Sequence, residues 1–190
     1  MSNVNRPNGL SVAMHMSGGM PNRLSRYHIA SGGAFNIFRG DAVVPTATSK
    51  NIARPTGATD RLQGVFDGCF YVRPDGEPIY GKYWPTGTVP LTGTTPDAWV
   101  YDDPNLLFEI QGDEDLILAD IGALADLTIG TGNAVTGVSG DMLDSSTIGS
   151  GAVFKIMDYA RRPENELATN YTKVIVAISS HYLKAAMTAI

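Results

Sequence analysis

At 190 residues with 43% hydrophobic content, the chain is long enough to fold as one domain with a real core. Its single cysteine, Cys69, excludes an intrachain disulfide and a thiolate metal cluster. The sequence has no apolar run of about 18 residues and no basic leader followed by an apolar segment, so we expect neither a membrane span nor secretion.

The net charge of −5 is distributed unevenly along the chain. Residues 1–61 carry seven Lys and Arg against two acids, residues 62–154 carry two against fourteen, and residues 155–190 carry five against three. A basic N-terminal third beside an acidic middle predicts association with an acidic surface or with another copy of the chain. The basic residues are scattered and lack regularly spaced aromatics, which argues against a nucleic-acid partner.

Residues 1–26 are predicted to form an extended N-terminal arm, and residues 27–190 a single β-rich body. Pro7 removes a backbone donor and favours a turn at Asn8 and Gly9, and the arm has too few apolar residues to fold alone. Such an arm is either disordered or laid on a partner, where its methionines can fill irregular gaps. The candidate binding residues are Asn5, Arg6, Pro7, Asn8, Leu10, Val12, Met14, Met16, Arg23 and Arg26.

From Tyr27 onward, short runs of β-branched and aromatic residues alternate with Gly, Pro and Asp turn signals. These runs predict strands near residues 27–30, 35–38, 41–44, 63–72, 79–84, 98–101, 106–110, 141–144, 153–158 and 173–182. The turn Pro74–Glu77 predicts a hairpin between the fourth and fifth of them. Gly64 and Gly68 predict a bulge or a close backbone approach inside the longest strand.

Only one segment has a helical pattern, and we expect a short helix or helical turn about Asp120–Leu124. Many short strands with frequent turns and nearly no helix predict an all-β fold. The alternatives are a β-sandwich, a jelly roll or a barrel-like body, each with the extended arm and at most one short helix. The pattern alone does not choose among them.

No segment predicts catalysis, a cofactor or a metal centre. Gly130 and Gly132 begin like a dinucleotide fingerprint, but Val135 occupies the next glycine position. Cys69 has no nearby base and is expected to be a buried structural thiol. His15, His28 and His181 are far apart in sequence. The acids Asp102, Asp103, Asp113, Glu114, Asp115, Asp141 and Asp144 are interpreted as solvated loop charge, with calcium bound between subunits as an alternative.

Five segments, in this order along the chain, resemble the capsid decoration (cement) proteins of tailed bacteriophages. They are NVNRPNGLS (3–11), GVF followed by an aromatic strand (64–71), YWPTGT (83–88), LADIGALADL (118–127), and FKIMDYARRPENE (154–166) with the closing Val-Ile-Val strand. The chain departs from the family pattern at Glu164, where Asp is expected, and at Leu167, where Gly is common.

The resemblance implies a non-enzymatic virion protein on the outer face of an icosahedral capsid, made in the host cytoplasm, with a β-sandwich or jelly-roll body. It implies the major capsid protein as partner, together with other copies of the chain in dimers or trimers, the dimer being favoured. In this interpretation Arg6, Arg23 and Arg26 pair with capsid carboxylates. Deletion of residues 2–24 is then expected to leave the body folded and to abolish capsid binding.

Two alternatives stay open at this point. The first is a structural component of the phage tail or baseplate, which has a different partner. The second is a carbohydrate-binding virion module, in which Tyr83, Trp84, Trp99 and Tyr101 form a sugar platform beside Asp102 and Asp103.

Overall fold

The structure, a computed structural model, describes residues 3–19, 23–47 and 50–184. Strands make up 41% of the structure and helices make up 3%, and no helix among the described residues is as long as seven residues. The all-β prediction is therefore confirmed. Within the described ranges, no helix combines the length and the apolar character needed to cross a bilayer.

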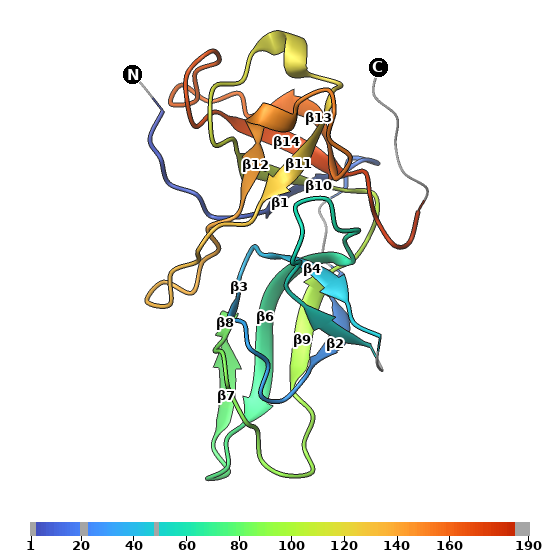
Figure 1. The fold of residues 1–190 in the computed structure, drawn as a ribbon, viewed down its shortest axis with the longest axis vertical. Coiled ribbons are helices and arrows are strands. Elements are labelled where there is room, and N and C mark those ends of the chain that lie inside the picture. The colour runs from blue at the N-terminus through green and yellow to red at the C-terminus, as the bar shows by residue number, and fades with distance from the viewer. Residues whose placement is uncertain (1–2, 20–22, 48–49, 185–190) are drawn as a thin grey trace.

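The strands form two lobes stacked along the long axis of the molecule (Figure 1). The sheet lobe contains residues 3–19 and 102–184, and it is built on a six-stranded antiparallel sheet. In spatial order its strands are β1 (Ser11–His15), β10 (Leu106–Gln111), β14 (Lys173–Ile178), β13 (Phe154–Tyr159), β11 (Leu124–Thr128) and β12 (Met142–Asp144).

The barrel lobe, residues 23–101, contains a closed five-stranded barrel. Its strands are β4 (Ala42–Pro45), β5 (Asn51–Ala53), β2 (Ser25–Ile29), β9 (Asp97–Tyr101) and β6 (Gly64–Val72), and β6 pairs with β4 to close the ring. The pair β2–β5 is parallel. Strand β7 (Pro78–Gly81) extends β6, and β3 (Ile37–Phe38) pairs with β8 (Tyr83–Trp84). Among the three predicted architectures, the structure therefore has the barrel.

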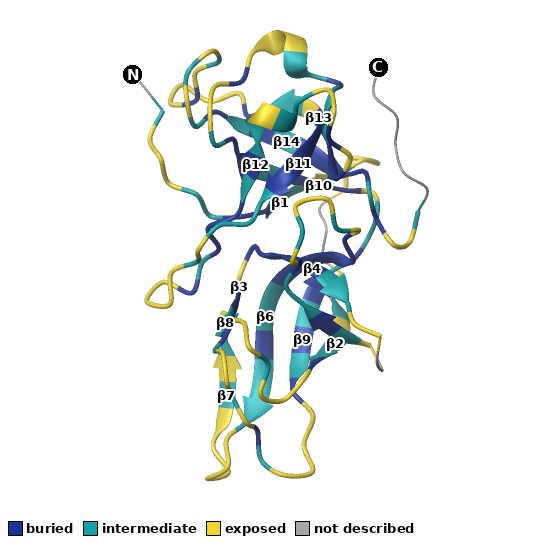
Figure 2. Ribbon diagram, viewed as in Figure 1, coloured by how far each residue is buried: buried dark blue, intermediate teal, exposed yellow. Residues whose placement is uncertain are grey.

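Each lobe has its own apolar cluster, but the two lobes are packed together. The barrel is filled by residues such as Phe66, Trp84 and Val100. The core of the sheet lobe contains Phe108 and Phe154, and it also includes Ala42, Leu62 and Val65 from the barrel lobe. Figure 2 shows buried residues continuing from the sheet into the junction between the lobes.

The strand predictions hold where β-branched and aromatic residues are dense. Strands β6 and β7 form the predicted hairpin, whose turn is closed by the Gly76 amide donating to the Arg73 carbonyl at 2.9 Å. The predicted bulge in β6 lies between Phe66 and Gly68. At Gly64, a Cβ atom would lie 2.1 Å from the Tyr101 carbonyl oxygen, so the close approach requires glycine.

Four local features differ from the prediction. Residues 11–15 and 25–26, assigned to the arm, belong to β1 and β2, and the three-residue strand β5 was not predicted. The helical segment is a 3₁₀ helix at Leu118–Asp120 (η1), followed by strand β11, because Gly122 adopts φ +93° and donates to the Ile156 carbonyl at 2.8 Å. A second 3₁₀ helix, η2, spans Ser145–Thr147, so the described residues contain two short 3₁₀ helices where at most one was expected.

Candidate functional site

The described part of the predicted arm lies on the chain's own body. The Asn3 side chain donates to the Glu166 carbonyl at 2.8 Å and accepts from the Glu166 amide at 2.9 Å. The fully buried Gln111 side chain accepts from the Arg6 amide and donates to the Asn5 side-chain oxygen, both at 3.0 Å. Residues 3–6 are therefore fixed by contacts with their own chain, which corrects the expectation that they order only on a partner.

Residues 7–10 continue through the junction between the lobes. Pro7 and Asn8 are half-buried, and the Asn8 side-chain amide donates to the Ser11 hydroxyl at 3.1 Å. Leu10 is 3% exposed, and its amide donates to the Gly40 carbonyl at 2.8 Å. Leu10 thus belongs to the core of the sheet lobe and is unavailable to a partner, contrary to its predicted role.

The remaining candidate residues divide between core and surface. Val12 is half-buried and packs against the core of the sheet lobe, whereas Met14 and Met16 are 47% and 41% exposed. Arg6, Arg23 and Arg26 are all exposed. Arg26 pairs with Asp97 at 3.0 Å and keeps 66% of its side chain exposed. The structure thus leaves the three arginines and the two methionines open to solvent, while residues 20–22 and 1–2 of the predicted arm lie outside the described residues.

A glycine fixes the path of this segment at the junction. Gly9 adopts φ +65°, and a Cβ there would lie 2.4 Å from the Gly40 carbonyl oxygen and 2.5 Å from the Ser139 Cβ. Gly9→Ala is expected to lower the free energy of unfolding by about 1–3 kcal/mol, because both the conformation and the space exclude a side chain. Urea unfolding would measure this, with Gly18→Ala as control, since Gly18 also has a positive φ (+85°) but a Cβ there would meet no atom within 4 Å.

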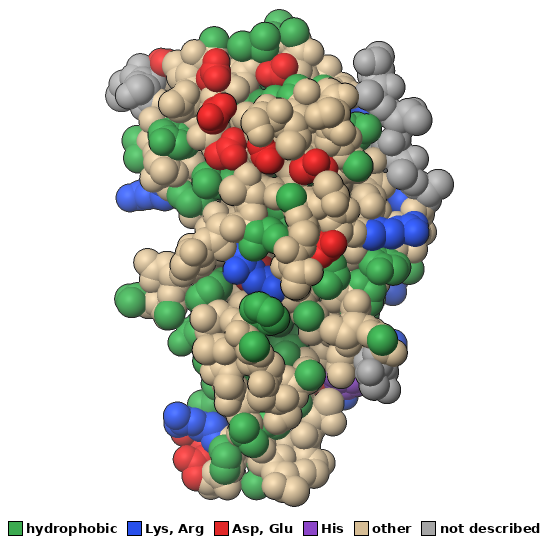
Figure 3. Space-filling model, viewed as in Figure 1, with side chains coloured by type: hydrophobic (Ala, Val, Ile, Leu, Met, Phe, Trp, Pro, Cys, Tyr) green, Lys and Arg blue, Asp and Glu red, His purple; other side chains and the backbone are tan. Residues whose placement is uncertain are grey.

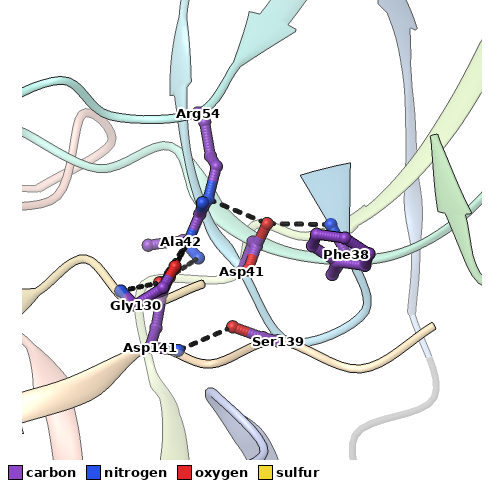
Figure 4. A network of polar contacts seen from close by, with 7 residues as sticks. All are labelled: Phe38, Asp41, Ala42, Arg54, Gly130, Ser139 and Asp141. Atoms are coloured by element: carbon purple, nitrogen blue, oxygen red, sulfur yellow. Dashed lines mark hydrogen bonds and ion pairs between the residues drawn. The ribbon is translucent and has the colours of Figure 1, made fainter. Parts of the chain in front are cut away.

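A buried ionic cluster joins the two lobes beside this segment (Figure 4). Arg54, which follows β5, forms two ion pairs. Its Nε lies 2.9 Å from Asp41 Oδ2, and its Nη2 lies 2.5 Å from Asp141 Oδ1. Both carboxylates are completely buried, and 14% of the Arg54 side chain is exposed. Arg54 also donates to the Gly130 carbonyl at 2.7 Å. We call Asp41, Arg54 and Asp141 the junction triad.

The charges within the junction triad do not balance, because one guanidinium faces two carboxylates. Asp141 is well satisfied: its oxygens accept from the amides of Gly130 (3.0 Å) and Ala42 (3.3 Å) as well as from Arg54. Asp41 Oδ2 accepts from the Phe38 amide at 2.8 Å, while its Oδ1 is buried without a hydrogen-bond partner. Burial and then the nearby Asp141 charge raise the pKa of Asp41 to about 7. Burial raises the pKa of Asp141 as well, but the oxygens of Asp141 accept more hydrogen bonds, so we expect a proton bound by the pair to lie on Asp41.

The acids interpreted as solvated loop charge do not all lie at the surface. Asp141 is fully buried in the triad, and Asp102 is 8% exposed and accepts from the Ser25 hydroxyl (2.7 Å) and the Tyr27 hydroxyl (2.8 Å). Burial, followed by the contact with Asp102, raises the pKa of Tyr27 to about 12. These two aspartates hold segments together rather than covering a surface.

The predicted sugar platform is not assembled. Trp84 is fully buried in the barrel, and its ring centre lies 5.0 Å from that of Tyr71 in an edge-on contact. The Tyr83 ring stacks on Phe38 with 5.3 Å between the ring centres. Trp99 is half-buried on a separate groove. Trp84 and Tyr83 therefore pack within the fold. The four aromatic side chains do not form the shared exposed surface that the carbohydrate-binding alternative requires.

Cysteine and histidine residues are also dispersed. Cys69 is 1% exposed, and burial raises the pKa of its thiol to about 12, as expected for a structural cysteine. His15 Nε2 lies 3.3 Å from Asp103 Oδ2, and His28 Nδ1 lies 3.4 Å from Asp97 Oδ1. His181 is buried in the segment that follows β14. Within the described part of the chain, no group of three or more His, Cys, Asp or Glu side chains is placed to hold a metal ion.

Searches of protein-family models, curated proteins and solved structures find no match to this chain. Arg54 and Gln111, which organise the junction and the N-terminal segment, were not singled out from the sequence, and neither lies in a motif that marks a buried polar residue.

Proposed function

We propose that this protein is a structural component of a tailed-bacteriophage virion that binds the outer surface of the capsid shell and stabilises it. A protein that binds only the assembled shell shifts the equilibrium toward that state by mass action. The observation that carries the proposal is that the five segments resembling decoration proteins contact one another in the fold.

These contacts connect segments that are far apart in sequence. Asn3 of the first segment bonds Glu166 of the last, and Leu10 reaches Phe66 of the second through Gly40, whose amide donates to the Phe66 carbonyl at 2.8 Å. The Cys69 thiol donates to the Tyr83 carbonyl at 3.4 Å, and Gly122 bonds Ile156. The segments that carry the resemblance are therefore parts of one folded unit, although that unit contains a barrel rather than the β-sandwich or jelly roll that the resemblance implies.

The charge distribution suggests which lobe faces the shell. The sheet lobe carries thirteen acids against six bases, whereas the barrel lobe carries eight bases against six acids. On the face in Figure 3, the acidic side chains gather over the sheet lobe. An acidic capsid surface would repel the sheet lobe and attract exposed bases of the barrel lobe such as Arg23 and Arg26.

Co-sedimentation with expanded, undecorated capsids tests the proposal. Wild-type protein is expected to bind saturably, with an affinity that falls as salt rises. Arg23→Glu combined with Arg26→Glu is expected to weaken binding by about tenfold or more, because two attractive contacts become repulsive. Arg73→Glu with Lys82→Glu makes the same charge change at exposed positions near β7 and is expected to bind as wild type.

Absence of binding at every salt concentration would overturn the proposal. The same protein should then be tested on purified tails, because the tail or baseplate alternative predicts saturable binding there. Equal loss of capsid binding in both double variants would overturn the assignment of the surface to Arg23 and Arg26.

A further inference from the structure

The outer face of the sheet lobe departs from the usual alternation of apolar and polar residues. Val12, Phe108, Val176 and Ile156 are paired across four strands and point into the core. The neighbouring rows lie on the opposite face, because successive side chains alternate along a strand. Their members include Met14 paired with Leu107, and Ile175 paired with both Glu109 and Asp158. In antiparallel sheets such an outward face is usually polar.

These outward residues line a groove of about 710 Å³. Its apolar part includes Met14, Leu107, Met157 and Ile175, and Met14 and Met157 are 47% and 38% exposed. All of the lining comes from β1, β10, β13, β14 and the segment 160–162 that follows β13. We call this the sheet groove. Methionine side chains at a surface suit a contact with an irregular apolar partner.

The charges that line the sheet groove are two acids and two bases, and each base lies beside an acid. Arg162 pairs with Glu109, and Arg161 pairs with Asp158 at 3.4 Å while its guanidinium lies 5.2 Å from the Tyr159 ring centre. Arg161 and Arg162 remain 72% and 46% exposed. The groove is therefore electrically balanced, although the lobe that carries it has a large excess of acids.

We propose that the sheet groove is the contact surface between two copies of this chain, related by a two-fold axis. A two-fold contact places the same patch on both sides, so the patch must be complementary to itself. A patch with equal acids and bases satisfies this condition, because a rotation brings the arginines of one copy to the acids of the other. A strongly acidic or basic partner would instead select an unbalanced patch.

The role of this dimer rests on the proposed function, since a dimer would present two capsid-binding barrel lobes to the shell. Dimerisation itself does not depend on capsid binding. Its test uses purified protein without capsids, so failure of either proposal leaves the other measurable. Sedimentation velocity over a concentration series is expected to show wild-type protein as a dimer. A wild-type chain that stays monomeric throughout would overturn the proposal.

Charge exchange gives the sharper test. Arg161→Glu with Arg162→Glu makes the groove wholly acidic, and Glu109→Arg with Asp158→Arg makes it wholly basic. Each double variant alone is expected to dimerise at least about tenfold more weakly, because like charges face each other across the axis. An equimolar mixture is expected to restore a mixed dimer. Arg73→Glu with Lys82→Glu, away from the groove, is expected to dimerise as wild type.

Variants that dimerise like wild type, or a mixture that stays monomeric, would overturn the two-fold contact. Circular dichroism and thermal unfolding would establish that each variant is folded. If the double variants are unfolded, Met157→Lys supplies a milder change, because this partly exposed residue lies at the bulge of β13. It is expected to weaken dimerisation by a similar factor, and unchanged dimerisation would overturn the proposal.

Discussion

Deletion of residues 2–24 is expected to unfold the protein, rather than to leave a folded body that has lost its partner. The deletion removes β1 from the edge of the six-stranded sheet and removes Leu10 from the core. It also removes the bonds from Asn3 to Glu166 and from Asn5 and Arg6 to the buried Gln111. A domain of this size is stable by about 5–15 kcal/mol, and burial of one leucine alone contributes about 2–5 kcal/mol of that.

Urea unfolding followed by tryptophan fluorescence would measure the loss, since Trp84 is completely buried in the native barrel. The deleted protein is expected to lack a cooperative transition. Leu10→Ala isolates the core contribution and is expected to cost about 2–5 kcal/mol, whereas Met16→Ala, at an exposed position directly after β1 and outside the sheet groove, is expected to cost less than about 0.5 kcal/mol. A deleted protein with the wild-type transition midpoint would show that the segment is an independent arm.

The sequence predicted the elements whose signal is local. Strand β6 contains a dense run of aromatic and β-branched residues, and the turn after it is specified by Pro74–Glu77, so both were predicted correctly. Strand β1, with sequence SVAMH, has only a weak alternation and follows a proline and a glycine. It becomes a strand because β10, about a hundred residues later, offers an edge. A strand pairing between residues so far apart in sequence cannot be recognised from a short stretch of residues around either strand.

The junction triad was missed for the same reason. Asp41 and Asp141 are a hundred positions apart, and Arg54 stands before a proline in a segment with turn residues. Each residue taken alone is typical of a solvated loop. They become a buried cluster only after the barrel has placed Asp41 and Arg54 beside the segment that leads from β11 to β12. The fold class could therefore be predicted from the sequence, but the polar contacts that join the lobes could not.

Asp41→Asn is expected to change how the stability of the protein depends on pH. The pKa of Asp41 in the folded chain is about 7, above the ordinary value of 3.8 that it has when unfolded. Between these two values the folded state keeps a proton that the unfolded state has lost, so the contribution of Asp41 to stability is present below about pH 4 and falls as pH rises to about 7. The slope for one proton approaches about 1.4 kcal/mol per pH unit.

The wild-type curve alone does not reveal this slope, because His181 acts in the opposite direction. Burial lowers the pKa of His181 to about 4 from an ordinary 6.5. Between those values the unfolded state binds a proton that the folded state excludes, so this contribution to stability is present above about pH 6.5 and is lost as pH falls. The informative quantity is therefore the difference in unfolding free energy between the Asn variant and wild type, in which His181 cancels.

An asparagine at position 41 resembles the protonated carboxyl, because its oxygen can accept from the Phe38 amide and lie beside the Arg54 guanidinium in place of Oδ2. Its amide nitrogen then takes the place of Oδ1, which has no partner to lose. The free-energy difference, measured by urea unfolding from pH 4.5 to 8.5, is expected to shift in favour of the variant as pH rises to about 7 and to stay constant above it. Asp75→Asn, in the exposed β6–β7 turn, makes the same chemical change away from the junction triad and serves as the control. Parallel curves for Asp41→Asn and wild type would show that the junction triad holds no proton and that Arg54 compensates both carboxylates.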